Sequence, residues 1–346
     1  MIPHSKPCLG VEEAEAVKRV ISSGQLAQGP EVFALERELA DFIGVKGAVA
    51  VSSGTAGLHL SLEALNIRQG CAVHIPSFVC TALLNAVNYT GAEAIICDVD
   101  PMTGNMSYED LLRRLNDKPQ AVILPHMFGI PVNPDKFISS GHPVIEDCAQ
   151  SIGAETGGKK TGAFGILSVF SFYATKLICG GEGGAVVSNS LELLETIRNL
   201  RDYDEQPEYR VRYNYKMTDL QAAVVRIQLR KLPEFIRRRQ TIAQIFDKAV
   251  DETSWNSIDR PKGAICFRYL IKCSNADKVI KLFREKGISC AGPVYKPLHR
   301  YFDFSGYPGT EQLYSTAVSI PCYPALRDEE IQYISKSIKE LGKLYA

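Results

Sequence analysis

Net charge, paired cysteines and long hydrophobic runs are all missing from this sequence. Its 39 Lys and Arg residues balance 39 Asp and Glu residues, so no electrostatic attraction favours nucleic acid or a membrane surface as a partner. The 10 cysteines form no C-x-x-C pair. Several of them, such as Cys97 and Cys148, stand in apolar segments, which indicates reduced core thiols. No apolar run is long enough to span a bilayer, and residues 1–10 lack the apolar centre of a signal peptide. We therefore expect a soluble cytoplasmic protein.

Internal repeats and low-complexity tracts are also missing, so the chain should form ordinary globular domains. A length of 346 residues suits two domains, or one large domain with an appendage. The apolar content of 45% and the charged content of 23% are typical of soluble globular proteins. A neutral chain gains little colloidal protection from charge, which is compatible with a permanent oligomer.

Strand and helix patterns alternate through the first half of the chain. Amphipathic spacing predicts helices at 11–23 and 30–44, the second beginning with Pro30. Strands are then expected at 47–52, 72–76, 94–97, 121–124, 143–146 and 184–188, and helices at 55–66, 81–89, 108–115, near 134 and at 191–200. This order predicts βαβ units and a mainly parallel sheet covered by helices on both faces. Residues 157–172 resemble a hairpin attached to that sheet.

A long helix separates this half from a smaller C-terminal region. A capping box at Thr218 and Gln221 begins the helix, which is expected to end near Leu232. Its apolar residues occupy two faces, which predicts burial at a domain or subunit interface. A strand at 266–271, helices at 276–285 and 328–344, and the loop 287–299 follow. We therefore expect a large α/β domain over residues 1–235 and a small α+β domain over residues 236–346.

The segment 167–184 carries the strongest chemical signal. Residues 167–172 form an apolar strand, and Lys176 follows among apolar neighbours, ahead of four glycines at 180, 181, 183 and 184. A lysine at the mouth of a buried strand is desolvated, which lowers its pKa and suits imine formation with an aldehyde. A lysine that extends to solvent before a glycine-rich turn would fit the same segment.

Polar side chains also follow other predicted strands, where ligands of parallel sheets bind. Residues 51–57 connect a strand to a helix whose free N–H groups could hold a phosphate, although a capped helix without a ligand fits equally well. Asp147 ends another strand, three residues before Gln150, and could be an N-cap or the partner of a protonated ring nitrogen. Ser171 stands at the end of the strand that precedes Lys176. A phosphate cradle, a carboxylate and a desolvated lysine together indicate pyridoxal phosphate.

The chain resembles the DegT/DnrJ/EryC1/StrS family of sugar aminotransferases, which have fold type I, the aspartate aminotransferase fold. The resemblance covers nearly the whole chain and is carried by an ordered set of motifs. These are Gln28–Pro30, Ser53–Ala56, Pro76–Phe78, Asn85–Val87, Pro125–His126 with Gly129, Glu146–Gln150, Phe170–Lys176, Gly181–Gly184, Tyr213–Met217, Gln221–Ala223 and Pro297–His299.

The resemblance implies a role for each matching position. Lys176 would form the internal aldimine with pyridoxal 5'-phosphate and act as the general acid and base. Asp147 would pair with the pyridine nitrogen, and Gln150 would lie near the ring oxygen. The cofactor phosphate would be held by a group of small residues, namely Gly54, Thr55, Ala56 and Ser171.

The resemblance also implies a homodimer with shared active sites. Asn214 would reach the phosphate of the neighbouring subunit's cofactor, which agrees with the two-faced helix that follows it. The loop that holds His299 would line the side where a nucleotide-linked sugar binds, although a surface histidine fits this position as well.

Three positions depart from the family pattern. Cys80 stands where the family usually has an aromatic residue over the pyridine face, so ring stacking is weaker or comes from Phe78. Arg212 and Lys216 stand where the family usually has glycine and arginine, and an ammonium gives no bidentate contacts. The presence of Lys176 argues against the sugar dehydratase branch, where histidine replaces it.

We therefore expect a pyridoxal phosphate-dependent aminotransferase that moves an amino group from L-glutamate to C4 or C3 of a nucleotide-linked 6-deoxyhexose. The product would enter a polysaccharide or a glycosylated metabolite. A carbocyclic ketone is an alternative acceptor, and a regulatory protein that binds the cofactor without turnover is an alternative of another class. A cysteine desulfurase of the same fold is disfavoured because Cys290 and Cys322 are expected to be packing residues. No metal site is expected.

Overall fold

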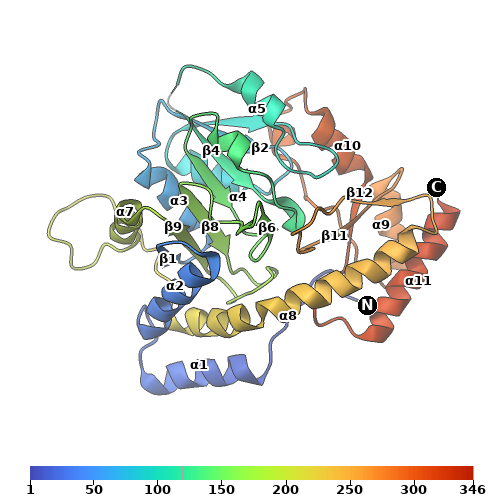
Figure 1. Cartoon of the computed structure of the whole chain (residues 1–346), viewed down its shortest axis with the longest axis horizontal. Helices are drawn as coiled ribbons and strands as arrows, with labels where there is room; N and C mark the ends of the chain where they lie inside the picture. Colours follow the sequence, from blue (N-terminus) through green and yellow to red (C-terminus); the bar gives the residue numbers. More distant parts are fainter. Residues whose placement is uncertain (119, 346) are drawn as a thin grey trace.

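The central feature of the computed structural model, which describes residues 1–118 and 120–345, is a seven-stranded sheet between two layers of helices (Figure 1). Its strands are β1 (Gly47–Val51), β2 (Ala72–Pro76), β3 (Glu93–Cys97), β4 (Gln120–Pro125), β5 (Val144–Asp147), β8 (Leu167–Ser171) and β9 (Gly184–Ser188). They are ordered β1-β9-β8-β5-β4-β2-β3. Strand β9 runs antiparallel to both of its neighbours, β1 and β8, and the remaining pairs of the sheet are parallel. The mainly parallel α/β sheet expected from the sequence is confirmed.

Alternate residues of each strand pack against opposite helix layers, which is why these strands are apolar along their whole length. In β1, for example, Val49 and Val51 belong to one core cluster and Ala48 and Ala50 to another. The first layer contains α3 (Gly54–Ala64), α4 (Ala82–Tyr89) and α7 (Leu191–Arg201). The second contains α2 (Pro30–Ile43), α5 (Tyr108–Arg114), α6 (Asp135–Ile138) and the first half of α8 (Asp219–Val250). The carboxyl ends of the strands stay open between the layers.

The hairpin expected at 157–172 was placed wrongly. The hairpin is shorter and consists of β6 (Glu155–Thr156) and β7 (Lys159–Lys160). Gly157 and Gly158 form its turn with φ values of 55° and 78°, which glycine adopts without steric cost. Strand β8 instead pairs with β5 and β9 in the central sheet, because its side chains are apolar toward both helix layers.

Helix α8 begins at the predicted capping box but does not end near Leu232 as expected. It continues through Pro233 to Val250. Proline removes one backbone donor, and the apolar face of the second half, with Phe235 and Phe246 buried, sustains the helix beyond it. The first half packs on α1 (Val11–Ser23) and α2, and the second half on α11 (Asp328–Leu344) (Figure 1). The proposed domain boundary after residue 235 therefore lies inside one helix.

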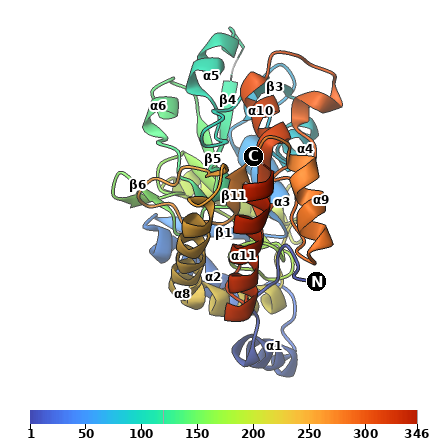
Figure 2. The ribbon, with the colours of Figure 1, turned by 90° about the vertical axis from the view of Figure 1, so that its right-hand side faces the viewer.

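The C-terminal region has its own core around a three-stranded antiparallel sheet. The sheet is formed by β10 (Asn256–Ser257), β11 (Tyr269–Lys272) and β12 (Ala317–Ile320) and is accompanied by α9 (Ala276–Glu285), α10 (Pro308–Thr316) and α11. Figure 2 shows α11 along the side of this region. The strand expected from residue 266 begins only at Tyr269, since Cys266 has a φ of 53° and cannot continue an extended chain. Strand β12 and helix α10 were not predicted.

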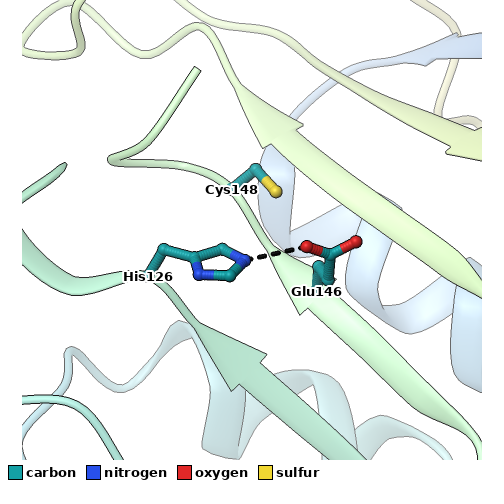
Figure 3. A group of neighbouring side chains, drawn as sticks. All are labelled: His126, Glu146 and Cys148. Atoms are coloured by element: carbon teal, nitrogen blue, oxygen red, sulfur yellow. Dashed lines mark hydrogen bonds and ion pairs between the residues drawn. The ribbon is translucent and has the colours of Figure 1, made fainter. Parts of the chain in front are cut away.

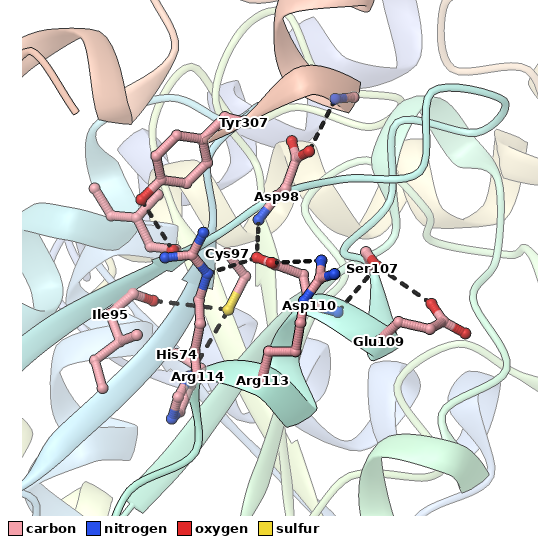
Figure 4. Close-up of polar contacts among 12 residues, drawn as sticks. His74, Ile95, Cys97, Asp98, Ser107, Glu109, Asp110, Arg113, Arg114 and Tyr307 are labelled. Atoms are coloured by element: carbon pink, nitrogen blue, oxygen red, sulfur yellow. Dashed lines mark hydrogen bonds and ion pairs between the residues drawn. The ribbon is translucent and has the colours of Figure 1, made fainter. Parts of the chain in front are cut away.

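A polar cluster joins α10 to the central sheet (Figure 4). The Asp98 carboxylate, just after β3, accepts hydrogen bonds from the backbone N–H groups of Gly309 and Thr310, both at 2.8 Å. The guanidinium of Arg114 lies 4.9 Å from the centroid of the Tyr307 ring. These contacts fix the C-terminal segment beside two short 3-10 helices, Met127–Gly129 and Leu298–Tyr301. None of the helices in the described ranges is both long and apolar enough to cross a membrane.

Candidate active site

A cavity of about 250 Å³ opens at the carboxyl ends of β1, β2, β5 and β8. Parallel strands bring their carboxyl ends to one edge, so residues far apart in the sequence meet there. Most of the predicted cofactor residues line this cavity, namely Gly54, Thr55, Cys80, Asp147, Gln150, Ser171 and Lys176. Val79, Leu58, Leu83, Met127, Tyr173 and Glu182 also line it and were not predicted. Such apolar and surface residues carry no recognisable chemical signal in a sequence.

Lys176 enters the cavity from a short loop between β8 and β9. The loop is closed by backbone hydrogen bonds from Ala174 to Gly181 (3.0 Å) and from Gly180 to Phe172 (2.8 Å). The Nζ of Lys176 makes no hydrogen bond to any residue in the described ranges. Burial lowers the pKa of Lys176, the nearby Arg268 charge lowers it further, and the charge of Asp147 opposes the change. The predicted desolvation of this amine is therefore present in the structure.

Asp147 ends β5 with one carboxylate oxygen engaged. Its Oδ1 accepts the N–H of Ala149 at 3.0 Å, and its other oxygen has no partner within residues 1–118 and 120–345. Burial raises the pKa of Asp147, whereas the Ala149 N–H and the positive charge of Lys176 lower it. A protonated ring nitrogen against the free oxygen would favour the carboxylate, so this position fits the pyridine nitrogen of pyridoxal phosphate.

The start of α3 and the end of β8 form a cradle for an anion. The Ser53 hydroxyl accepts the N–H of Ala56 at 3.1 Å and caps the helix. A side chain at Gly54 would place its Cβ 3.0 Å from the Cβ of Ser171, so glycine keeps open the space between the helix start and the serine. The family resemblance implied that Ala56 helps to hold the phosphate, but its N–H donates to the Ser53 hydroxyl. Gly54 and Thr55 form the cavity wall at this point. These features fit a phosphate group.

The amide of Gln150 and the thiol of Cys80 complete the cofactor side. The Gln150 Oε1 accepts the N–H of Phe128 at 2.9 Å, from a backbone turn in which Phe128 has a φ of 60°. The Gln150 side chain is thereby fixed in the cavity wall. Phe78 does not line the cavity. It is buried and its ring lies edge-on to Phe128 at 6.3 Å, so of the two alternatives given for Cys80, weaker ring stacking fits this cavity better than stacking by Phe78, and it stays a prediction.

A buried group at the end of β5, formed by His126, Glu146 and Cys148, could be taken for a metal site (Figure 3). The ligand atoms of Glu146 and His126 already have partners. Glu146 accepts the His126 Nε2–H at 2.9 Å, the N–H groups of residues 162, 164 and 165, and the Ser168 hydroxyl. The His126 Nδ1 accepts the N–H of Val132 at 3.0 Å. We therefore read the group as a structural support for the end of β5.

A second chamber of about 260 Å³ adjoins the first and shares Lys176, Gln150, Cys80 and Met127 with it. Thr81 and Thr175, near the central sheet, form part of the remaining wall. The rest of the wall comes from the C-terminal region and is formed by Phe267, Arg268, Pro293, Val294, Tyr295, Lys296 and Tyr301. Of these, only the residues of the loop 287–299 were expected near a substrate. Arg268 and Phe267 lacked any signal because the fold alone brings the start of β11 to Lys176.

His299 supports this loop from behind and does not line either chamber. It is buried, with Nδ1 2.6 Å from the Ser77 hydroxyl and Nε2 2.7 Å from the Glu311 carboxylate. Its ring also stacks on Tyr307 at 4.5 Å. Both ring nitrogens of His299 thus already have partners. A contact between His299 and the substrate stays a prediction.

Residues 212–216, the segment around Asn214, are not among the residues that line either chamber. Asn214 is exposed between Tyr213 and Tyr215, whose rings stack at 5.1 Å. Lys216 is paired with Asp202 and Asp204. Arg212 donates to Asn199 Oδ1 at 3.2 Å and to the Glu208 carbonyl at 2.8 Å. The two cations that depart from the family pattern thus have partners within their own subunit.

Comparison with known proteins gives a consistent result over nearly the whole chain. Residues 7–339 match the model of the DegT/DnrJ/EryC1/StrS aminotransferase family. The chain is 30% identical over 358 residues to GDP-perosamine synthase of Escherichia coli O157:H7 and 30% identical over 362 residues to GDP-perosamine synthase of Vibrio cholerae, with 98% of each chain covered in both cases. The crystal structure of the aminotransferase TlmJ from Streptoalloteichus hindustanus is similar with a TM-score of 0.92, 29% identity and 98% of each chain covered.

Proposed function

Because the chain belongs to the DegT/DnrJ/EryC1/StrS aminotransferase family, we propose that it transfers an amino group from L-glutamate to a keto group of a nucleotide-linked sugar. It is a pyridoxal phosphate-dependent transaminase, as its family membership establishes. The acceptor position we propose is C4 or C3 of a 6-deoxyhexose, and the product would be an amino sugar. The observation that carries the proposal is the meeting of Lys176, Asp147 and the Ser171 cradle in one cavity.

The predicted polar groups Asp147, Ser171 and Gln150 of the first chamber each have a place in this chemistry. Bound pyridoxal phosphate supplies an electron sink for a carbanion next to nitrogen. Asp147 would hold the positive charge of the ring nitrogen with its free oxygen. Ser171 and the start of α3 would bind the phosphate, and the Gln150 amide would orient the ring.

Lys176 would be both the covalent anchor of the cofactor and the proton carrier. Its lowered pKa increases the fraction of neutral amine, which is the form that can react with a carbonyl and accept a proton. In the half-reaction with glutamate, Nζ would take the proton from the α-carbon of the donor and return it to the carbon on the other side of the donor nitrogen, two atoms further along. In the half-reaction with the sugar, the same nitrogen would move a proton in the opposite direction.

The second chamber is the proposed site of both substrates, since it opens on the other side of Lys176. The two relatives named GDP-perosamine synthase make a GDP-linked keto sugar the first acceptor to test. We also propose a cytoplasmic homodimer in which Asn214 reaches the partner's cofactor site. The exposure of Asn214 and its position outside both chambers support this arrangement.

The test is an amino-transfer screen with glutamate and a panel of keto acceptors, scored by mass spectrometry. The panel contains GDP-, dTDP- and UDP-linked keto sugars and, as a separate arm, carbocyclic ketones. We expect one nucleotide-linked sugar to gain an amino group with wild-type protein and none with Lys176→Ala. Amination of a carbocyclic ketone alone would overturn the proposed acceptor class.

A further inference from the structure

Arg268 places a positive charge in the inner wall of the second chamber without an acidic partner. It precedes β11 and shares the chamber with Lys176. None of the ion pairs in the described ranges includes Arg268. An arginine that is largely removed from water normally pairs with a carboxylate or another anion.

The surroundings of Arg268 add positive charge. Three cations approach the ring of Phe267: the Arg268 guanidinium carbon at 5.3 Å from the ring centroid, the Lys176 Nζ at 5.7 Å and the Arg239 guanidinium carbon at 5.9 Å. Arg239 is buried, donates to the carbonyl groups of Phe267 and Cys322, and leaves its Nε without a partner. Asp147, whose charge acts on Lys176, lines the first chamber and not the second.

The hydrogen-bond partner of Arg268 does not compensate its charge. The Nη1 of Arg268 lies 3.0 Å from both ring nitrogens of His4. Burial and the charge of Arg268 lower the pKa of His4 to about 4, so this imidazole is neutral at physiological pH. Burial and the charge of Arg239 lower the pKa of Arg268 to about 10, so the guanidinium stays protonated. A guanidinium has five N–H donors, and most of those of Arg268 remain available.

We propose that Arg268 binds a carboxylate of the amino-acid donor at the inner end of the second chamber. This inference rests on the proposed function, since a transaminase must accept an amino acid beside Lys176. The α-carboxylate carbon of an amino acid is two bonds from its amino nitrogen, so a donor reacting beside Lys176 brings an anion into the same small space. The diphosphate of a nucleotide sugar is held away from the reacting carbon by the sugar ring.

The local packing supports a fixed orientation of the guanidinium. The Arg268 guanidinium carbon and the Lys176 Nζ both lie within 5.7 Å of the Phe267 ring centroid, and the Phe267 carbonyl accepts a hydrogen bond from Arg239 at 3.0 Å. Arg239 is therefore a positioning residue for the Phe267–Arg268 turn. A planar guanidinium held in this way can give two parallel hydrogen bonds to a carboxylate, which an ammonium cannot do.

The binding test uses the holoenzyme and two probes that do not react. Glutarate carries the two carboxylates of a five-carbon donor without its amine, and inorganic pyrophosphate represents the diphosphate of a nucleotide sugar. Isothermal titration should show that Arg268→Gln weakens glutarate binding by about 10- to 100-fold, the range expected for loss of charge-assisted hydrogen bonds. Arg268→Lys should weaken it less, and pyrophosphate binding should change less than twofold.

Arg238→Gln is the matched control, because Arg238 lies on the outer face of α8 and pairs with Asp328 at 2.6 Å. It should bind both probes like the wild type, and thermal melting should confirm that all variants are folded. Equal glutarate affinity in wild type and Arg268→Gln would overturn the inference. Loss of pyrophosphate binding alone would also overturn it, because Arg268 would then be a diphosphate ligand.

A kinetic experiment separates this inference from the proposed function. The half-reaction with glutamate, without acceptor, is followed by the change in cofactor absorbance. Arg268→Gln should raise the glutamate concentration for half-saturation by about 10- to 100-fold, with a smaller change in the limiting rate. If the wild type does not react with glutamate, the proposed donor is wrong. If it reacts and Arg268→Gln saturates at the same concentration, the assignment of Arg268 is wrong.

Discussion

Burial acts in opposite directions on the two charged residues of the first chamber. It lowers the pKa of Lys176 and raises that of Asp147, because each charged form loses hydration in an apolar setting. A protonated ring nitrogen next to Asp147 would restore its carboxylate form. The amine of Lys176 would then keep the neutral fraction that its reaction with a carbonyl requires.

Asp147→Asn should therefore lose activity while the fold is kept. Asparagine cannot stabilise a protonated ring nitrogen, and truncating one partner of a buried charge pair costs roughly 2–5 kcal/mol. We expect kcat/KM to fall by about 30-fold or more in steady-state assays. Asp135→Asn, at an exposed position, is the control. Wild-type activity of Asp147→Asn would show that the ring nitrogen is held by another group.

The contribution of Glu146 to the stability of the fold is expected to depend on pH. Burial alone would raise the pKa of Glu146, but the hydrogen bond from His126 and the N–H groups of Gly165 and Gly162 lower it to about 2 from 4.5. The carboxylate thus stabilises the fold above pH 4.5, and this contribution is lost as the pH falls toward 2. Glu146→Gln should cost about 3–5 kcal/mol of unfolding free energy at neutral pH.

Urea unfolding across this pH range checks the prediction. The difference between wild type and Glu146→Gln should shrink between pH 4.5 and 2. Glu155→Gln, where the exposed carboxylate lies 3.9 Å from Lys160, should match the wild type throughout. A difference that is constant with pH would mean that Glu146 acts through packing and not through its charge.

At the scale of elements, the phosphate cradle depends on how closely β9 approaches the turn before α3. A Cβ at Gly184 would lie 2.6 Å from the backbone carbon of Ser53, a distance that only a shift of the turn can relieve. Gly184→Ala should therefore move the start of α3 and weaken cofactor binding by about tenfold or more, the effect of one lost hydrogen bond to a charged group. Gly10→Ala has no such contact and should keep wild-type affinity.

Equilibrium titration with pyridoxal phosphate measures this effect. Gly10→Ala changes the start of α1, far from the cavity, and controls for a general loss of stability. Unchanged cofactor affinity in folded Gly184→Ala would contradict the proposed phosphate cradle.

Elements with a strong local signal were the ones that could be predicted from the sequence. The strands up to β5 and the capping box of α8 follow from apolar runs and capping residues. The end of α8 could not be predicted, because tertiary burial of residues such as Phe246 outweighs the break that Pro233 suggests. Strand β12 was missed because its pairing with β11 is long-range. Arg268 was missed because only the tertiary fold places it beside Lys176.

At the scale of the whole molecule, the position of Asn214 defines a test of shared sites. In a dimer with shared sites, one subunit would supply Lys176 and the other Asn214 to each site. Neither Lys176→Ala nor Asn214→Ala should then be fully active, but a mixed dimer would contain one intact site of two. Mixing equal amounts should restore up to about a quarter of wild-type activity, because half of the dimers are mixed.

The control for this mixture is Lys176→Ala with Asp147→Asn. These two residues line one cavity of a single subunit, so every site in the mixed dimer carries one defect and no activity should return. Equal recovery in both mixtures, or no recovery in either, would count against shared sites.

The covalent role of Lys176 is tested most directly by reducing the holoenzyme with borohydride and mapping the modified peptide by mass spectrometry. We predict that the mass of the reduced cofactor is found on the peptide that contains Lys176 and on no other peptide, and that the label is absent from Lys176→Ala. A label on a different lysine, or an unlabelled Lys176 peptide in active enzyme, would contradict the account.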